Sequence, residues 1–185
     1  MQLPKRKPTR LHNYNYSRDG YYFITICTYE RKCILSNIVG EGEPLPQLTQ
    51  NGKIAENYIL SINEKYSCAE IDKYIIMPNH LHIILRLKNN GRGNPSPTIS
   101  NIIGWMKYNI TKEINQANNT QGNTIFQRSF HDHIIRNEKD YLKIWNYVDA
   151  NTQKWKEDCF YKYANKILLA FDNIMCYNTC RLKER

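Results

Sequence analysis

AEIDKYIIMPNHLHIILRL, residues 69–87, contains two apolar segments joined by a two-residue link. Each segment, 69–77 and 80–87, has the length and the β-branched content of a buried strand. Pro78 and Asn79 form the link, and a link this short joins antiparallel neighbours. The stretch therefore predicts a β-hairpin, with its second strand in the central, rigid part of a sheet.

The remaining elements follow from the spacing of apolar residues on either side of this hairpin. They are a strand at 21–28, a helix at 49–66, a helix from Thr98 to about Asn115, a segment at 125–136 that is mostly strand, a helix at about 138–151 and an apolar helical segment at 164–175. Thr98 and Asn137 have the side chains of helix N-caps. The order β-α-β-β-α-β-α predicts an α+β fold, a ferredoxin-like antiparallel sheet with helices mainly on one face.

The chain is basic: 26 lysines and arginines against 17 acidic residues give a net charge of +9. Such an excess favours polyanionic partners, because neutralising phosphates releases condensed counterions, although a basic solvated surface would have the same composition. Four cations near the N-terminus are candidate phosphate contacts, unless they belong to a tail with no role in binding. They are Lys5, Arg6, Lys7 and Arg10.

A cytoplasmic location is expected, with no membrane partner. No apolar run reaches the roughly 18 residues that span a bilayer, and the N-terminus has no hydrophobic segment of a secretory signal. The six cysteines form no CxxC pair, which is typical of reduced thiols in a cytosolic protein.

His80 and His82 are the most distinctive pair in the sequence. Residues two apart on a strand point to the same face, so the two imidazoles lie side by side while Leu81 and Ile83 face away. Two imidazoles on one rigid strand can bind a divalent metal through their ring nitrogens. The alternative is an ordinary pair of core or surface histidines.

The helix at 138–151 carries two residues that suit the same site. Tyr147 and Asn151 are four apart and are therefore neighbours on one helical face. An amide oxygen of Asn151 would complete a three-ligand metal site with positions open for a phosphate oxygen, and Tyr147 would lie one turn away. Alternatively, Tyr147 is one of 14 tyrosines and only packs the helix.

Three segments together resemble the REP-associated tyrosine transposases, within the insertion-sequence transposases that use a single catalytic tyrosine. They are MPNHLHIIL at 77–85, YYFITICTYERKCIL at 21–35 and FQRSFHDHIIRNEKDYLKIWNYVDANTQKW at 126–155. The resemblance implies a basic arm at 1–19, a catalytic His-hydrophobic-His tyrosine nuclease domain at 20–155 and a C-terminal helical extension at 156–185. Thr152 stands where the family usually has proline after the helix.

The resemblance also implies the chemistry. His80, His82 and Asn151 would hold Mg²⁺ or Mn²⁺, and Tyr147 would attack a DNA phosphodiester to give a 5′-phosphotyrosine and a free 3′-hydroxyl. The implied substrate is single-stranded or hairpin DNA, either palindromic repeats or element ends. The chain would act as a monomer or a homodimer. The protein sequence does not distinguish a mobile transposase from a domesticated nuclease, whereas the DNA on either side of the gene would.

Several alternatives stay open at this point. Tyr141 is the competing nucleophile, and a non-catalytic nucleic-acid-binding module on the same fold is the main rival function. A histidine-triad hydrolase is strongly disfavoured because Ile84 stands where its third histidine would be. Further DNA contacts are expected from Arg128 and His133, with a purely structural role as the alternative for His133. Trp105, Lys107 and Tyr108 would either stack unpaired bases or form the core and rim of the second helix.

Overall fold

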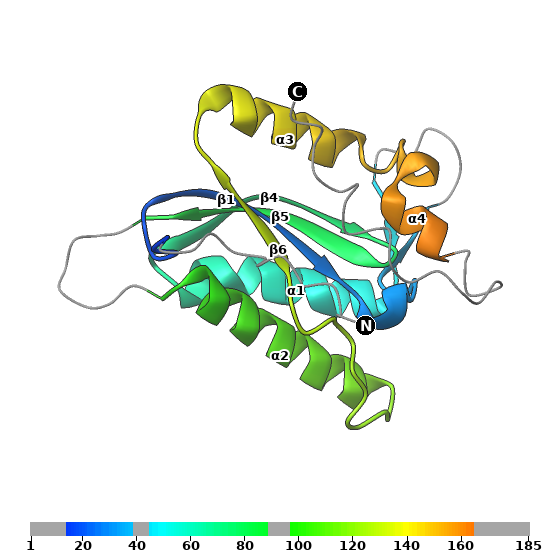
Figure 1. The fold of residues 1–185 in the computed structure, drawn as a ribbon. Helices are drawn as coiled ribbons and strands as arrows, with labels where there is room; N and C mark the ends of the chain where they lie inside the picture. Colours follow the sequence, from blue (N-terminus) through cyan, green and yellow to red (C-terminus); the bar gives the residue numbers. More distant parts are fainter. Residues whose placement is uncertain (1–13, 39–44, 89–96, 165–185) are drawn as a thin grey trace, which may run out of the picture.

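The predicted hairpin lies within the central sheet of the structure, a computed structural model that describes residues 14–38, 45–88 and 97–164 (Figure 1). The strands are β1 Gly20–Cys27, β2 Ser36–Asn37, β3 Gln47–Leu48, β4 Ala69–Met77, β5 His80–Leu87 and β6 His131–Ile135. The helices are α1 Gln50–Lys65, α2 Ile99–Ala117, α3 Glu138–Ala150 and α4 Cys159–Ala164, with short 3₁₀ helices η1 Tyr29–Arg31 and η2 Trp155–Glu157.

Four strands form the main sheet in the order β4-β5-β1-β6, and all neighbours are antiparallel. β4 and β5 pair across the Pro78–Asn79 turn, with His80 opposite Met77 on one side and Cys27 of β1 on the other. β2 and β3 form a separate two-stranded ribbon. The order and directions of the four strands are ferredoxin-like, so the predicted fold class is confirmed.

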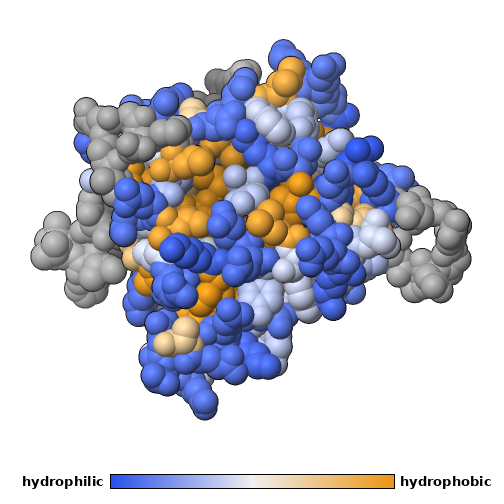
Figure 2. Space-filling model, turned by 180° about the vertical axis from the view of Figure 1, so that it is seen from behind, coloured by the Kyte–Doolittle hydropathy of each residue, from blue (hydrophilic) through white to orange (hydrophobic). Residues whose placement is uncertain are grey.

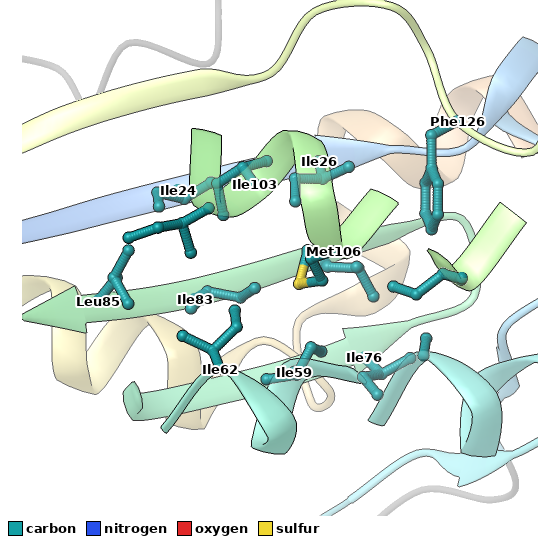
Figure 3. Close-up of a cluster of buried hydrophobic side chains, with 14 of the residues drawn as sticks. Ile24, Ile26, Ile59, Ile62, Ile76, Ile83, Leu85, Ile103, Met106 and Phe126 are labelled. Atoms are coloured by element: carbon teal, nitrogen blue, oxygen red, sulfur yellow. The ribbon is translucent and has the colours of Figure 1, made fainter. Parts of the chain in front are cut away.

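Helices cover both faces of this sheet, α1 and α2 on one face and α3 on the other (Figure 1). α1 and α2 pack against the face that carries Ile24, Ile83 and Leu85, and their isoleucines interlock with these side chains (Figure 3). α3 covers the opposite face with Ile144 and Val148. Leu81 and Ile83 lie in the α1–α2 core, as predicted, which leaves the α3 face of β5 to the two histidines.

Thr98 and Asn137 cap their helices as predicted, and Thr49 caps α1 in the same way. Thr49, Thr98 and Asn137 each accept a hydrogen bond from a backbone N–H three residues on, at the starts of α1, α2 and α3. Each cap satisfies one of the backbone donors that the first helical turn leaves unpaired. The end of α2 differs slightly from the prediction, because the helix continues past Asn115 to Ala117.

The prediction that residues 125–136 are mostly strand is wrong for its first half. Only His131–Ile135 is a strand, and Phe126 makes a single bridge to Thr28. The Lys107 ammonium on α2 donates to the carbonyl oxygens of Gln127 and Arg128 at 2.6 and 3.0 Å. These carbonyls therefore turn toward α2 and do not pair with a neighbouring strand. The helical segment expected at 164–175 lies outside the described residues apart from the last residue of α4.

Among the described residues, no helix is both long and apolar enough to cross a membrane. Seen from behind, the surface is mostly hydrophilic, and its apolar patches are interrupted by hydrophilic side chains (Figure 2). Among the described residues, Cys27, Cys33 and Cys68 are free thiols.

Candidate active site

His80 and His82 lie at the start of β5, on the sheet face covered by α3. Their rings are neighbours, with centroids 4.6 Å apart. They are 0% and 1% exposed, because α3 and the segment that follows it cover them. Phe160 and Trp155 provide part of that cover, with ring centroids 4.3 and 6.0 Å from that of His80.

Each imidazole is oriented by a hydrogen bond at Nδ1. His82 Nδ1 shares a bond of 2.9 Å with Thr25 Oγ1, and His80 Nδ1 lies 3.0 Å from Asn79 Oδ1. Asn79 is itself held, because its Nδ2 donates to the Phe160 carbonyl at 3.0 Å, which turns its oxygen toward His80. Both rings therefore present Nε2 to the site, the arrangement found in metal-binding histidines.

Burial keeps both histidines neutral. It lowers the pKa of His82 to about 3. It also lowers the pKa of His80 well below the ordinary value, and the neighbouring His82 and the charge of Arg31 act in the same direction. A neutral imidazole has the free lone pair that a metal ligand needs.

Tyr147 approaches the histidines from α3. Its hydroxyl oxygen is 3.3 Å from His82 Nε2, and its ring meets Phe23 edge to face. Burial and then the charge of Asp158 raise the pKa of this hydroxyl, while a hydrogen bond from Asn151 lowers it. The hydroxyl is therefore protonated at neutral pH and becomes a nucleophile only as its proton leaves.

Asn151 lies at the end of α3, one turn after Tyr147, and is buried. Its side-chain amide is hydrogen-bonded to the Tyr147 hydroxyl and to the Asp158 carboxylate. Its Oδ1 atom is buried and has no hydrogen-bond partner among the described residues, and the same is true of His80 Nε2. The structure thus brings together His80, His82, Tyr147 and Asn151.

Asp158, between η2 and α4, is one of two residues of the site that the sequence did not indicate. Its carboxylate and the ring nitrogens of His80 and His82 all lie within 4.8 Å of one another. Burial raises the pKa of this carboxyl, against the effects of the Phe160 backbone N–H and of Arg31. Asp158 follows α3 by a turn and a 3₁₀ helix, a conformation for which the sequence carries no periodic signal.

Arg31 supplies the positive charge of the site and was likewise not singled out. Glu30 and Arg31 have φ values of 53° and 56°, a strained conformation for two residues that are not glycine. This turn directs the Arg31 guanidinium over the Phe160 ring, 4.2 Å from its centroid. The guanidinium also lowers the pKa of the Asp158 carboxyl and of the Cys27 thiol, so it faces the site.

The other candidate residues lie outside this cluster. His133 Nε2 is 2.8 Å from Asp140 Oδ2, which ties β6 to the first turn of α3. Arg128 lies in the segment before β6. The basic residues Lys5, Arg6, Lys7 and Arg10 lie outside the described residues.

Tyr141, the competing tyrosine, occupies a different part of α3. Its hydroxyl donates to Asp72 on β4, and its ring packs edge to face on Tyr21. Tyr21 is six residues along β1 from Cys27, the residue opposite His80, or about 20 Å at the rise of a strand. The contacts of Tyr141 therefore lie toward the far end of the sheet.

The donor set fits a divalent cation. Two imidazole nitrogens and a carboxylate oxygen lie within 4.8 Å of one another. The Asn151 amide oxygen and His80 Nε2 are buried without a hydrogen-bond partner among the described residues. An unpaired buried polar atom costs about 1–3 kcal/mol, and a bound cation would satisfy both. Imidazole with oxygen ligands suits several divalent metals, Mn²⁺ among them.

Comparison with known sequences identifies the family. The sequence model of the IS200-like transposases matches residues 16–151, which is well over half of the chain and includes both histidines, Tyr147 and Asn151. The chain belongs to the IS200-like transposase family. This membership confirms the resemblance drawn from the three sequence segments.

Individual relatives agree with this assignment. An uncharacterized protein of Haemophilus influenzae is 31% identical to this IS200-like transposase over 172 residues, covering 84% of this chain and 93% of the relative. A second protein of that organism, provisionally named a REP-associated tyrosine transposase, is 28% identical over 149 residues and 76% of each chain.

A solved structure is similar in fold. It is described as the REP-associated tyrosine transposase bound to a REP hairpin, and the match has a TM-score of 0.52 at 22% identity. The match covers 79% of this chain and 74% of the solved chain.

Proposed function

We propose that this IS200-like transposase cuts and rejoins single-stranded or hairpin DNA through a 5′-phosphotyrosine on Tyr147. The observation that carries the proposal is the 3.3 Å approach of the Tyr147 hydroxyl to His82 Nε2, beside His80. A tyrosine hydroxyl held against a pair of oriented, neutral imidazoles combines a nucleophile with metal-ligating atoms in one site.

Mg²⁺ or Mn²⁺ is the proposed cofactor, held by His80, His82 and Asn151, with Asp158 as a further ligand. When bound, such an ion would polarise the scissile phosphate and stabilise the charge that develops during its displacement. Thr25 and Asn79 would keep the two Nε2 atoms aimed at it through their bonds to Nδ1. Arg31 would add a fixed positive charge near the phosphate.

The residues of the chain account for the bond changes. The Tyr147 hydroxyl loses its proton to solvent, its oxygen bonds to phosphorus, and the bond from phosphorus to the 3′ oxygen breaks. The 3′ oxygen takes up a proton and leaves as a hydroxyl. Because the phosphodiester energy is kept in the tyrosine linkage, a 3′-hydroxyl on another strand can reverse the reaction without a nucleotide cofactor, and the sequence contains no GxxxxGK[ST] motif.

Single-stranded or hairpin DNA is the proposed partner because the net charge of +9 favours a polyanion and a relative of the same fold is described as bound to a REP hairpin. Palindromic repeats or element ends would supply such hairpins. Both a monomer and a homodimer are compatible with a site to which one chain supplies all the named ligands.

The test is to incubate the protein with Mn²⁺ and hairpin-bearing single-stranded DNA and to look for a covalent adduct on a denaturing gel. The unaltered chain should form the adduct. His80→Ala and His82→Ala should abolish it while the circular dichroism spectrum stays unchanged. Binding without any adduct from the unaltered chain would favour the rival function, a non-catalytic nucleic-acid-binding module.

A further inference from the structure

A hollow lies apart from the histidine site, between the later half of α2 and the chain that leads to β6. These two segments lie at the lower right of Figure 1. Its volume is about 380 Å³, and it is widely open to solvent. The residues that matter for recognition there are Lys107, Tyr108, Asn115, Asn123, Gln127 and Arg128. None of them is used by the proposed cleavage site.

The lining of this hollow is positively charged. Lys107 and Arg128 contribute to it, and none of the residues that line it is acidic. Lys107 is fixed in place by its bonds to the Gln127 and Arg128 carbonyl oxygens. Arg128 forms no ion pair with any residue that the structure describes, so its charge is available to an outside anion. The hollow therefore suits a ligand with a phosphate.

Tyr108 gives the same hollow an aromatic surface. It is 66% exposed and is the most exposed aromatic residue among those described. Its neighbour Trp105 is different, since its ring packs between those of Tyr58 and Tyr66 in the core. An exposed tyrosine next to two cations is a stacking platform for an unpaired base, and stacking of this kind tolerates any base.

Backbone hydrogen bonds connect the hollow to the proposed cleavage site. The Gln127 N–H donates to the Cys27 carbonyl at 2.9 Å, and the Tyr29 N–H donates to the Ile125 carbonyl at 2.8 Å. Cys27 is opposite His80 in the sheet. The Gln127 backbone is thus two strand spacings from that of His80, about 10 Å in the plane of the sheet. Because α2 and the histidines lie on opposite faces of the sheet, a DNA strand that reaches both would pass around the β6 edge.

We propose that this hollow binds one unpaired nucleotide of the substrate strand close to the bond that is cut, with its base on Tyr108 and its phosphate beside Arg128. The proposal rests on the proposed function, because it assumes that single-stranded DNA reaches the histidine site. It adds a reason for a single-stranded flank next to the hairpin: the hairpin stem alone would leave the hollow without a ligand.

The experiment compares two DNAs, a hairpin with a single-stranded flank and the same hairpin without one, by fluorescence anisotropy at fixed salt. Tyr108→Ala should weaken binding of the flanked hairpin by about tenfold, the loss expected for one stacked base, and leave the bare hairpin unchanged. Tyr108→Trp keeps an aromatic ring and should bind the flanked hairpin as tightly as the unaltered chain does. Leu60→Ala, which removes another exposed apolar side chain, on α1, is the matched control and should change neither.

Arg128→Gln gives an independent measurement. It should reduce the slope of log affinity against log salt by about 0.7 for the flanked hairpin only. Equal affinities of Tyr108→Ala and the unaltered chain for the flanked hairpin, or an equal loss on both DNAs, would overturn the inference. Absence of the covalent adduct with the unaltered chain would instead overturn the proposed function, so the two failures are distinguishable.

Discussion

At the scale of residues, burial and hydrogen bonding prepare the two histidines for metal binding before any ion arrives. Burial keeps the imidazoles neutral, and Thr25 and Asn79 fix which nitrogen faces the site. The cost is two buried polar atoms, on His80 and Asn151, without hydrogen-bond partners among the described residues. Such unpaired buried atoms lower the stability of the fold, and proteins tolerate them where a functional site requires them.

The same burial predicts how stability depends on pH. The pKa of His82 is about 3 in the folded chain and 6.5 when unfolded, so below pH 6.5 the unfolded state binds a proton that the folded state does not. The free energy of unfolding should therefore decrease as the pH is lowered from 7 to 5, by about 2 kcal/mol per buried neutral histidine. Urea unfolding with a chelator present measures this, and His82→Gln should show a smaller fall. An unchanged pH dependence in that variant would contradict the account.

Metal affinity separates the roles of Asn151 and Asp158. If both are ligands, Asn151→Ala and Asp158→Ala should each weaken Mn²⁺ binding by at least about tenfold, measured by calorimetry without DNA. Asp140→Asn removes a carboxylate that pairs with His133 outside the site and should leave the affinity unchanged. Mn²⁺ binding that survives in Asp158→Ala would remove that residue from the ligand set.

The histidine pair could be predicted from sequence because alternation along a strand is a local rule. Tyr147 and Asn151 could be placed on one face for the same reason, by helical spacing. Asp158 and Arg31 could not, because irregular turns bring them to the site and such turns have no periodic pattern. The burial of both histidines also depends on Phe160 and Trp155, which are distant in sequence.

At the scale of elements, the capped helices and the hairpin were predictable, while the segment before β6 was not. Thr49, Thr98 and Asn137 mark helix starts through side chains that bond the local backbone. The conformation of residues 125–130 instead depends on Lys107, which is distant in sequence and takes two of their carbonyl oxygens. A tertiary contact therefore overrode a local preference for extended structure.

The start of α1 gives a prediction about two glycines. A Cβ on Gly52 would lie 2.0 Å from the Leu35 carbonyl oxygen, which Thr49 holds through two hydrogen bonds. Gly52→Ala should therefore destabilise the fold by roughly 1–3 kcal/mol or more. Gly104→Ala on α2 has open space and should stabilise it by up to about 1 kcal/mol, as alanine does in an exposed helix. Urea unfolding of both variants checks the signs, and a stabilised Gly52→Ala protein would show that α1 packs differently.

At the scale of the whole molecule, the proposed site forms where several elements meet at one end of the sheet. β5 supplies the histidines, α3 supplies Tyr147 and Asn151, and the turns at η1 and before α4 supply Arg31 and Asp158. The element order predicted the ferredoxin-like sheet, but not that the chain after α3 returns to cover the site. The predicted domain boundary at 155 stays a prediction, although Trp155 and Phe160 belong to one buried cluster.

The basic N-terminal arm remains a hypothesis about DNA affinity. If Lys5, Arg6, Lys7 and Arg10 contact phosphates, a chain without residues 1–10 should bind DNA more weakly and with less dependence on salt. Each lost contact should lower the slope of log affinity against log salt by about 0.7 on single strands. A truncated protein with the slope of the intact chain would show that the arm does not contact the DNA.

The central claim is that Tyr147 is the nucleophile, and the most direct measurement is the covalent adduct formed by two matched variants. Tyr147→Phe removes the hydroxyl that lies 3.3 Å from His82 Nε2, and Tyr141→Phe removes a hydroxyl bound to Asp72. With Mn²⁺ and hairpin-bearing single-stranded DNA, we expect no adduct from Tyr147→Phe and an adduct from Tyr141→Phe, with DNA binding retained by both. An adduct that persists in Tyr147→Phe and is lost in Tyr141→Phe would contradict the account.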